Sequence, residues 1–97
     1  MAIADISVIA LGTSSASMHS YVREAVRVLE RRDLKHEVGA MGTAVEGNVD
    51  EILAALKEIH AACFALGAPR LVITLKIDDR RDKEQTIESK KNAAQQG

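Results

Sequence analysis

The 97-residue sequence has few aromatic side chains, one cysteine and no excess of either charge. Tyr21 and Phe64 are its aromatic residues. Because proteins commonly hold single-stranded bases by stacking them on aromatic rings, the sequence disfavours an RNA-binding module. The single cysteine, Cys63, excludes an internal disulfide and a metal site built from several thiolates of one chain. A net charge of -1 creates no field that would attract nucleic acid or an anionic membrane.

Long apolar runs are also missing. The first five residues lack the basic region and apolar stretch of a signal peptide, and no segment is typical of a membrane span. We therefore expect a cytoplasmic protein. A composition of 46% hydrophobic and 28% charged residues is typical of a folded domain. We expect one domain over residues 1–91 and a disordered tail over residues 92–97, which are small and polar.

The first half of the domain predicts a strand followed by a helix. Residues 2–11 alternate between two faces, which is typical of a strand, and Gly12 ends the pattern. Ser17 is a good helix N-cap, and the helix should end near Asp33. Its apolar stripe contains Met18, Val22, Ala25 and Leu29.

The second half repeats this arrangement with an additional strand. Residues 35–41 and 43–47 can form two short strands joined by a turn at Gly42. Asn48 and Glu51 have the spacing of a capping box and begin the second helix. Its apolar stripe contains Ile52, Leu56, Ile59, Cys63 and Leu66.

The remaining elements complete a recognisable order. Gly67 and Pro69 end the second helix, and the apolar run over residues 71–75 predicts a fourth strand. Strand, helix, strand, strand, helix, strand is the βαββαβ order of ferredoxin-like α+β folds, in which two helices cover one face of a four-stranded antiparallel sheet. Residues 83–91 are compatible with a short C-terminal helix, with Ile87 as almost its only apolar anchor.

The uncovered face of this sheet should be partly polar. In the predicted fold the first and fourth strands are neighbours, so their outward side chains lie together. Those chains include Asp5, Ser7, Thr74, Lys76 and Asp78. Ile3, Ile9 and Val72 add apolar area that can pack against another subunit. We therefore expect a homodimer or a dimer of dimers.

A dense group of charges follows the fourth strand. Three carboxylates there have the oxygen ligands that a divalent cation prefers, but two arginines interrupt their spacing and neutralise their charge. The pattern favours a salt-bridge network that fastens the last strand to a neighbour and that can also frame a site. The charged residues of the segment are Lys76, Asp78, Asp79, Arg80, Arg81 and Asp82.

Two loops have residues suited to a small polar ligand. The hydroxyls around Thr13 and Ser15 lie between a strand and a helix, where they can hold a phosphate or a polar ring edge, or can simply form a turn with an N-cap. Glu46 lies between two glycines, where its carboxylate can accept hydrogen bonds from an aminopyrimidine or be solvated on a hairpin. Both interpretations of each loop stay open.

The sequence offers no catalytic or metal-binding constellation. His19, His36 and His60 lie far apart, without the spacing of metal ligands. Cys63 falls in the apolar stripe of the second helix, where a cysteine usually acts as a small buried hydrophobe. No Ser-His-Asp or Cys-His arrangement is recognisable from the residue order. We therefore assign no catalytic residue, metal or cofactor.

Five stretches together resemble a known family. Residues 4–8, 11–13, 41–43, 45–47 and 76–83 are similar to the small thiamine-binding proteins, and the similarity spans about residues 3–90. The resemblance implies a ferredoxin-like fold, sheet-mediated dimers that pair into tetramers, and binding of thiamine or its hydroxymethylpyrimidine moiety without known chemistry.

The resemblance also implies site residues. The polar lining of the pocket would comprise Thr13, Ser15, Ser17, Thr43 and Glu46. Lys76, Asp78, Arg80 and Arg81 would frame the pocket or brace a subunit contact. This chain has Ala10 where the family often has proline.

Three functions are compatible with these patterns. The first is a non-enzymatic protein that binds thiamine or its pyrimidine precursor. The second is a structural homo-oligomer whose polar segments join subunits without a physiological small ligand. The third is a small enzyme with Glu46 or Asp78 as a general base, which ranks last because a fold is no evidence of activity.

Overall fold

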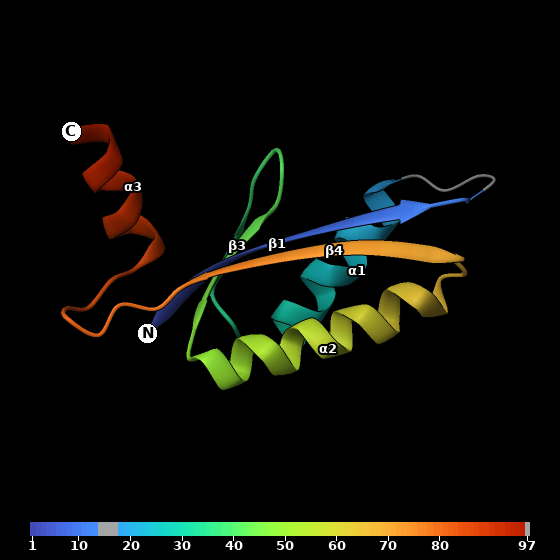
Figure 1. Cartoon of the computed structure of the whole chain (residues 1–97), viewed down its shortest axis with the longest axis horizontal. Helices are drawn as coiled ribbons and strands as arrows, with labels where there is room; N and C mark the ends of the chain where they lie inside the picture. The colour runs from blue at the N-terminus through green and yellow to red at the C-terminus, as the bar shows by residue number, and fades with distance from the viewer. Residues whose placement is uncertain (14–17, 97) are drawn as a thin grey trace.

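The computed structural model describes residues 1–13 and 18–96. Within them the elements follow the predicted order, with a third helix at the C-terminus (Figure 1). The strands form a four-stranded sheet of order β2-β3-β1-β4, in which every neighbouring pair is antiparallel. This confirms the predicted ferredoxin-like arrangement. The elements are β1 (Ala2–Leu11), α1 (Met18–Arg31), β2 (His36–Val38), β3 (Thr43–Gly47), α2 (Val49–Ala65), β4 (Arg70–Asp78) and α3 (Ile87–Gln96).

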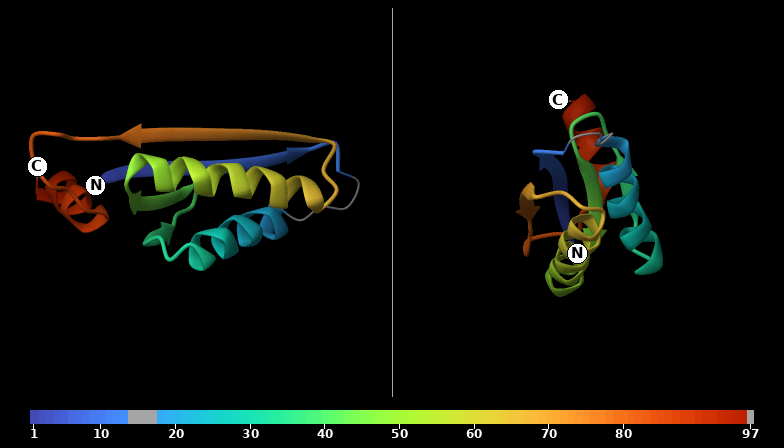
Figure 2. Two further views of the ribbon diagram at one scale, coloured as in Figure 1. Left: turned by 90° about the horizontal axis from the view of Figure 1, so that it is seen from below. Right: turned by 90° about the vertical axis from the view of Figure 1, so that its right-hand side faces the viewer.

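β1 is an interior strand of the sheet, and its side chains alternate between the two faces. Its even-numbered residues are buried, and α1 and α2 lie together on that side of the sheet (Figure 2). Opposite residues on antiparallel strands share a face. Asp5 pairs with Lys76, and Ile3 pairs with both Asp78 and Glu46, so these side chains belong to the face opposite α1 and α2, called the open face below.

The core lies between the sheet and the two long helices. The buried side chains of α2 include three of the predicted stripe: Ile52, Ile59 and Cys63. In α1 the predicted stripe is partly wrong, because Met18 is 40% exposed and Val22 is only partly buried. The buried face of α1 contains Tyr21, Ala25, Val28 and Leu29 instead. The reason is that α1 packs against α2 as well as β1. The buried face of the helix is therefore different from the one that a single apolar stripe predicts.

Local signals in the sequence explain the ends of α2. The Asn48 side chain accepts a hydrogen bond from the Glu51 backbone N–H at 2.8 Å, which confirms the predicted cap. After the helix, Gly67 has a φ of 104°, a conformation that favours glycine. β4 then begins at Arg70, directly after Pro69.

Two boundaries differ from the predictions. β2 covers only His36–Val38, because the chain turns at Gly39, whose N–H donates to the carbonyl of Gly42 at 2.8 Å. Residues 92–96 continue α3 as a helix, where a disordered tail was expected. α3 lies at the end of the molecule where β1 begins (Figure 1). The radius of gyration is 14.1 Å, whereas a compact chain of this length has about 12.5 Å.

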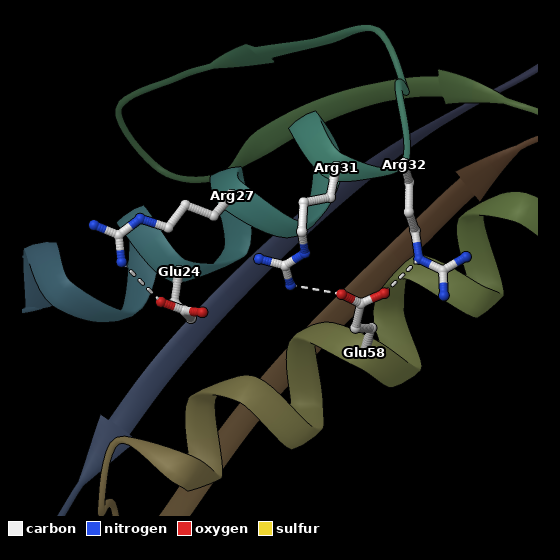
Figure 3. Close-up of polar contacts among 5 residues, drawn as sticks. All are labelled: Glu24, Arg27, Arg31, Arg32 and Glu58. Atoms are coloured by element: carbon white, nitrogen blue, oxygen red, sulfur yellow. Dashed lines mark hydrogen bonds and ion pairs between the residues drawn. The ribbon is translucent and has the colours of Figure 1, made fainter.

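An ionic contact joins the two long helices. Glu58 of α2 accepts hydrogen bonds from Arg31 at 2.6 Å and from Arg32 at 2.8 Å (Figure 3). These two guanidinium groups lower the pKa of Glu58 below its ordinary value of 4.5. A carboxylate with a depressed pKa stabilises the fold above its unfolded-state pKa, and the contribution is lost as pH falls through the folded-state pKa.

We therefore expect Glu58→Gln to lower the melting temperature at neutral pH but not in acid. The difference from wild type should begin to shrink below pH 4.5, the ordinary pKa of the group. It should disappear below the lower pKa of folded Glu58, because the wild-type carboxyl group is then protonated as well. Thermal unfolding followed by circular dichroism over a pH series measures this difference. Glu30→Gln is the matched control, since Glu30 lies on α1, is exposed and makes no side-chain ion pair with a described residue. An equal difference at every pH would contradict the assignment.

Candidate functional site

A groove of about 680 Å³ lies between the open face of the sheet and α3. The sheet contributes apolar groups such as Ile3 and Ala44, and α3 contributes Ile87 and Ala94. Charged side chains also line the groove: Asp5, Glu37, Lys76, Asp78, Lys90 and Lys91. An apolar cleft with a few converging polar groups is the usual form of a small-molecule site.

Two ion pairs connect α3 to the sheet. Lys90 contacts Asp78 of β4 at 2.6 Å, and Lys91 contacts Glu37 of β2 at 2.8 Å. The Lys90 ammonium group lowers the pKa of Asp78, against a smaller opposing effect of desolvation. These four charged groups are therefore already paired and contribute less to recognising a ligand.

Unlike those four charged groups, the carboxylate of Asp5 and the ammonium group of Lys76 have no partner among the described residues. They lie on paired positions of β1 and β4 and both line the groove. Among the residues that the structure describes, neither side chain makes a hydrogen bond or an ion pair. Asp5 is half-buried and approaches the backbone of Gly42 so closely that an added Cβ there would lie 2.7 Å from Oδ2. Glycine at position 42 therefore leaves room for the Asp5 carboxylate.

Glu46 has a different environment from the one expected. Its side chain is on the open face of β3, it is buried, and its Oε1 accepts a hydrogen bond from the Ile87 N–H at 3.1 Å. Lys35 lies 3.6 Å from the other oxygen. The carboxylate thus contacts the first residue of α3, immediately beside the groove.

The other predicted lining residues do not gather around Glu46. Thr43 pairs with Ile6, so its buried side chain is on the face covered by the helices, opposite Glu46. Thr13 follows the far end of β1, which is 10 residues long, or about 30 Å away along the strand. Ser15 and Ser17 lie outside the described residues.

The charged segment after β4 forms local pairs. Lys76 and Asp78 reach the groove, whereas Arg80 pairs with Asp82, and Arg81 with Asp79 at 3.3 Å. The hydrogen bond from Arg80 lowers the pKa of Asp82 to about 2. The segment thus contains two separate local pairs, while the predicted network that fastens the last strand to a neighbour stays a prediction.

Other candidate features are less suited to chemistry. A second hollow of about 330 Å³ beside α1 and the β2–β3 loop has no charged side chain among its described lining. Within residues 1–13 and 18–96, no three His, Cys, Asp or Glu side chains gather as a metal site would require, and no helix is long and apolar enough to cross a membrane. Cys63 is buried, and burial raises the pKa of its thiol.

Comparison with known proteins decides the family. A family profile described as "Thiamine-binding protein" matches residues 4–95. The chain belongs to the thiamine-binding protein family. Among its relatives, UPF0045 protein MJ1052 of Methanocaldococcus jannaschii is 48% identical over 91 residues, which is 94% of this chain and 89% of that protein. UPF0045 protein YqgV of Bacillus subtilis is 38% identical over 94 residues, or 93% and 90% of the two chains. None of these relatives is named for an enzymatic activity.

Solved structures of similar proteins share the whole fold. The crystal structure of MJ1052 superposes with a TM-score of 0.87 at 47% identity, over 97% of this chain and 95% of that one. A Thermotoga maritima protein with a proposed role in thiamine biosynthesis or salvage superposes with a TM-score of 0.82 at 28% identity, over 96% and 97%. Both similarities cover nearly the whole of this thiamine-binding family member.

Sequence reasoning placed Asp5 on the open face but not in the site. Its signal was a single carboxylate inside an otherwise apolar strand, at a position that pairs with Lys76. Glu37, Lys90 and Lys91 were also missed, because only the docking of α3 brings them to the groove. Together these groups place charged side chains of both signs beside the apolar surface of the groove in this family member.

Proposed function

We propose that this protein binds thiamine or its hydroxymethylpyrimidine moiety in the groove between the open face and α3, without catalysing a reaction. The observation that carries the proposal is the carboxylate of Asp5 opposite the ammonium group of Lys76, neither of which pairs with a described residue, in a chain of the thiamine-binding family. Lys76 is exposed and keeps its water, but Asp5 is half-buried. A half-buried charged group without a partner is costly, and a ligand that pairs with Asp5 recovers that cost.

The chemistry of the groove suits the pyrimidine half of thiamine. An aminopyrimidine presents a ring nitrogen and an exocyclic amine side by side, and a carboxylate such as Asp5 can accept from the amine. Lys76 can donate to the hydroxymethyl oxygen. Tyr21 is buried on α1 and Phe64 lies on α2, so neither aromatic ring is among the described residues that line the groove and could stack on the thiazolium. The pyrimidine moiety is therefore the better-supported ligand.

The charge of the groove favours a ligand with little net charge. Its lining has three carboxylates and three ammonium groups. A diphosphate would add several negative charges beside Asp5 without a free cation for each, since Lys90 and Lys91 are already paired. We therefore propose that the unphosphorylated compound binds better than its diphosphate.

The charged residues that were predicted to frame the pocket have supporting roles in the proposal. Lys76 and Asp78 frame the groove, while Arg80 and Arg81 shape the segment that leads to α3. A pocket lined by Thr13, Ser15, Ser17, Thr43 and Glu46 stays a separate prediction, because Thr13 and Thr43 lie away from this groove. Three further expectations also stay predictions: a cytoplasmic location, the absence of nucleic-acid and membrane partners, and assembly into a dimer of dimers.

Thermal unfolding with added ligand tests the proposal. Thiamine, its phosphates and hydroxymethylpyrimidine are titrated separately at fixed protein concentration, with uracil as a pyrimidine that lacks the exocyclic amine. At about 100 times the dissociation constant a ligand adds roughly 2.7 kcal/mol, which raises the midpoint by on the order of 10 °C in a domain of this size. No shift with any thiamine-related compound would reject the proposal.

The alternative is a structural homo-oligomer without a physiological small ligand. It is favoured by the exposed apolar side chains of Ile9 and Leu11 on β1 and Val72 on β4, because α3 leaves this part of the open face uncovered. Light scattering alongside the titration separates the two functions. A stable oligomer whose unfolding midpoint does not change with any ligand supports the alternative.

A further inference from the structure

The buried carboxylate of Glu46 contacts α3 in a way that a ligand contact would not require. Glu46 is 5% exposed and accepts a hydrogen bond from the N–H of Ile87, the first residue of the helix. A helix N-terminus has unpaired N–H groups and a partial positive charge, so a carboxylate stabilises it. The contact links the middle of the sheet to the beginning of α3.

α3 does not need Glu46 in order to be helical. Thr86 and Ser89 cap the helix reciprocally: the Thr86 hydroxyl accepts from the Ser89 N–H at 3.0 Å, and the Ser89 hydroxyl accepts from the Thr86 N–H at 2.8 Å. The helix can therefore remain intact when the Glu46 contact breaks. What Glu46 supplies is the position of the helix against the sheet.

Few other contacts between described residues hold α3 in place. Ile87 is its one buried side chain within residues 87–95, and Gln85 just before the helix donates to the Asp78 carbonyl at 2.8 Å. The ion pairs of Lys90 and Lys91 are about half exposed, and exposed pairs contribute little. Glu46 and Ile87 are thus the principal anchors, and both lie at the N-terminal end of the helix.

The position of α3 decides whether the groove is closed. Ile87, Lys90, Lys91 and Ala94 form its helical wall. We propose that Glu46 is a positioning residue that holds α3 against the sheet, and that release of α3 opens the groove for the entry and exit of ligand. The gating part of this inference rests on the proposed function, while the positioning part rests on the contacts of α3 alone.

Glu46→Gln tests the inference in the full-length protein, because glutamine retains the shape and one acceptor oxygen but has no charge. Hydrogen exchange of the ligand-free protein reports release of α3. Hydrogen bonds to charged groups are about twice as strong as neutral ones, so amides of residues 90–95 should exchange about five- to tenfold faster, with those of β1 unchanged. The dissociation rate of bound thiamine, or of hydroxymethylpyrimidine if only that compound binds, should increase by a similar factor.

Three further variants keep the experiment decisive. Glu84→Gln is the matched control, because Glu84 is exposed, precedes α3 and makes no ion pair with a described residue. Lys91→Met removes the exposed contact with Glu37 and should accelerate exchange about twofold. If Glu46→Gln unfolds the sheet, Lys91→Met still tests the gating, because it loosens α3 without altering Glu46. Glu46→Asp, which keeps the charge but withdraws it from the Ile87 N–H, then tests the positioning role.

The outcomes separate the parts of the inference. Unchanged exchange in α3 of Glu46→Gln would overturn the positioning role, and weaker binding with that result would instead assign Glu46 to direct contact with ligand. Faster exchange with an unchanged ligand dissociation rate would overturn the gating. If wild-type protein binds neither thiamine nor hydroxymethylpyrimidine, the proposed function and the gating both fail, and the exchange data alone decide the positioning role.

Discussion

Asp5→Asn is expected to weaken the binding of thiamine or hydroxymethylpyrimidine about ten- to hundredfold. Asparagine retains the size of aspartate, so the close approach to Gly42 is preserved while the negative charge is lost. A hydrogen bond to a charged group contributes about 1.5–3 kcal/mol, and each 1.4 kcal/mol is a factor of ten in the dissociation constant. Isothermal titration calorimetry of wild type and variant measures the change.

Asp33→Asn is the matched control for this prediction. Asp33 is exposed just after α1 and does not line the groove, so the same chemical change there should leave the affinity unaltered. Lowered affinity in both variants would indicate a general electrostatic effect instead of a contact. Affinity retained in Asp5→Asn would remove the groove from the proposed function, even if the thermal titration shows binding.

Ile59→Ala should be the most destabilising of the changes considered. Ile59 lies in the middle of α2 with no exposed surface, so truncation leaves a cavity beneath the sheet. Such substitutions cost about 2–5 kcal/mol, a large part of the roughly 5–15 kcal/mol that holds a typical domain folded. Urea unfolding should show a lower midpoint with an unchanged slope.

Leu53→Ala on the same helix controls for helix propensity. Leu53 is 45% exposed, and surface substitutions usually change stability by within about 0.5 kcal/mol. Equal losses in the two variants would mean that the buried face of α2 has been assigned wrongly. A loss confined to Ile59→Ala would confirm that the core lies where the structure places it.

The sequence predicted the architecture because its local signals agree with one another. The alternation of residues 2–11, the cap at Asn48 and the glycine at position 67 each determine an element or its end without help from distant residues. The buried face of α1 was less predictable. Val28 is buried because α1 contacts a second helix as well as the sheet, and such a contact leaves no local pattern.

The site was harder to predict than the fold because it depends on pairing between distant segments. Thr43 and Glu46 are three residues apart in one strand, so the pleat directs them to opposite faces. The resemblance to the thiamine-binding family had implied one pocket for both residues. Asp5 becomes a candidate only when its neighbours are known, since the approach of Gly42 and the docking of α3 give the carboxylate its surroundings.

The central position of β1 also determines when the protein can finish folding. β1 is made first, yet one of its two partners is β4, and Ile3 pairs with Asp78 near the other end of the domain. Contacts between such distant residues slow folding, because a long loop must close before they form. During synthesis one edge of β1 therefore stays unpaired until β4 has been made. The newly made chain is thus exposed to aggregation through its N-terminal strand, and the last strand ends that exposure.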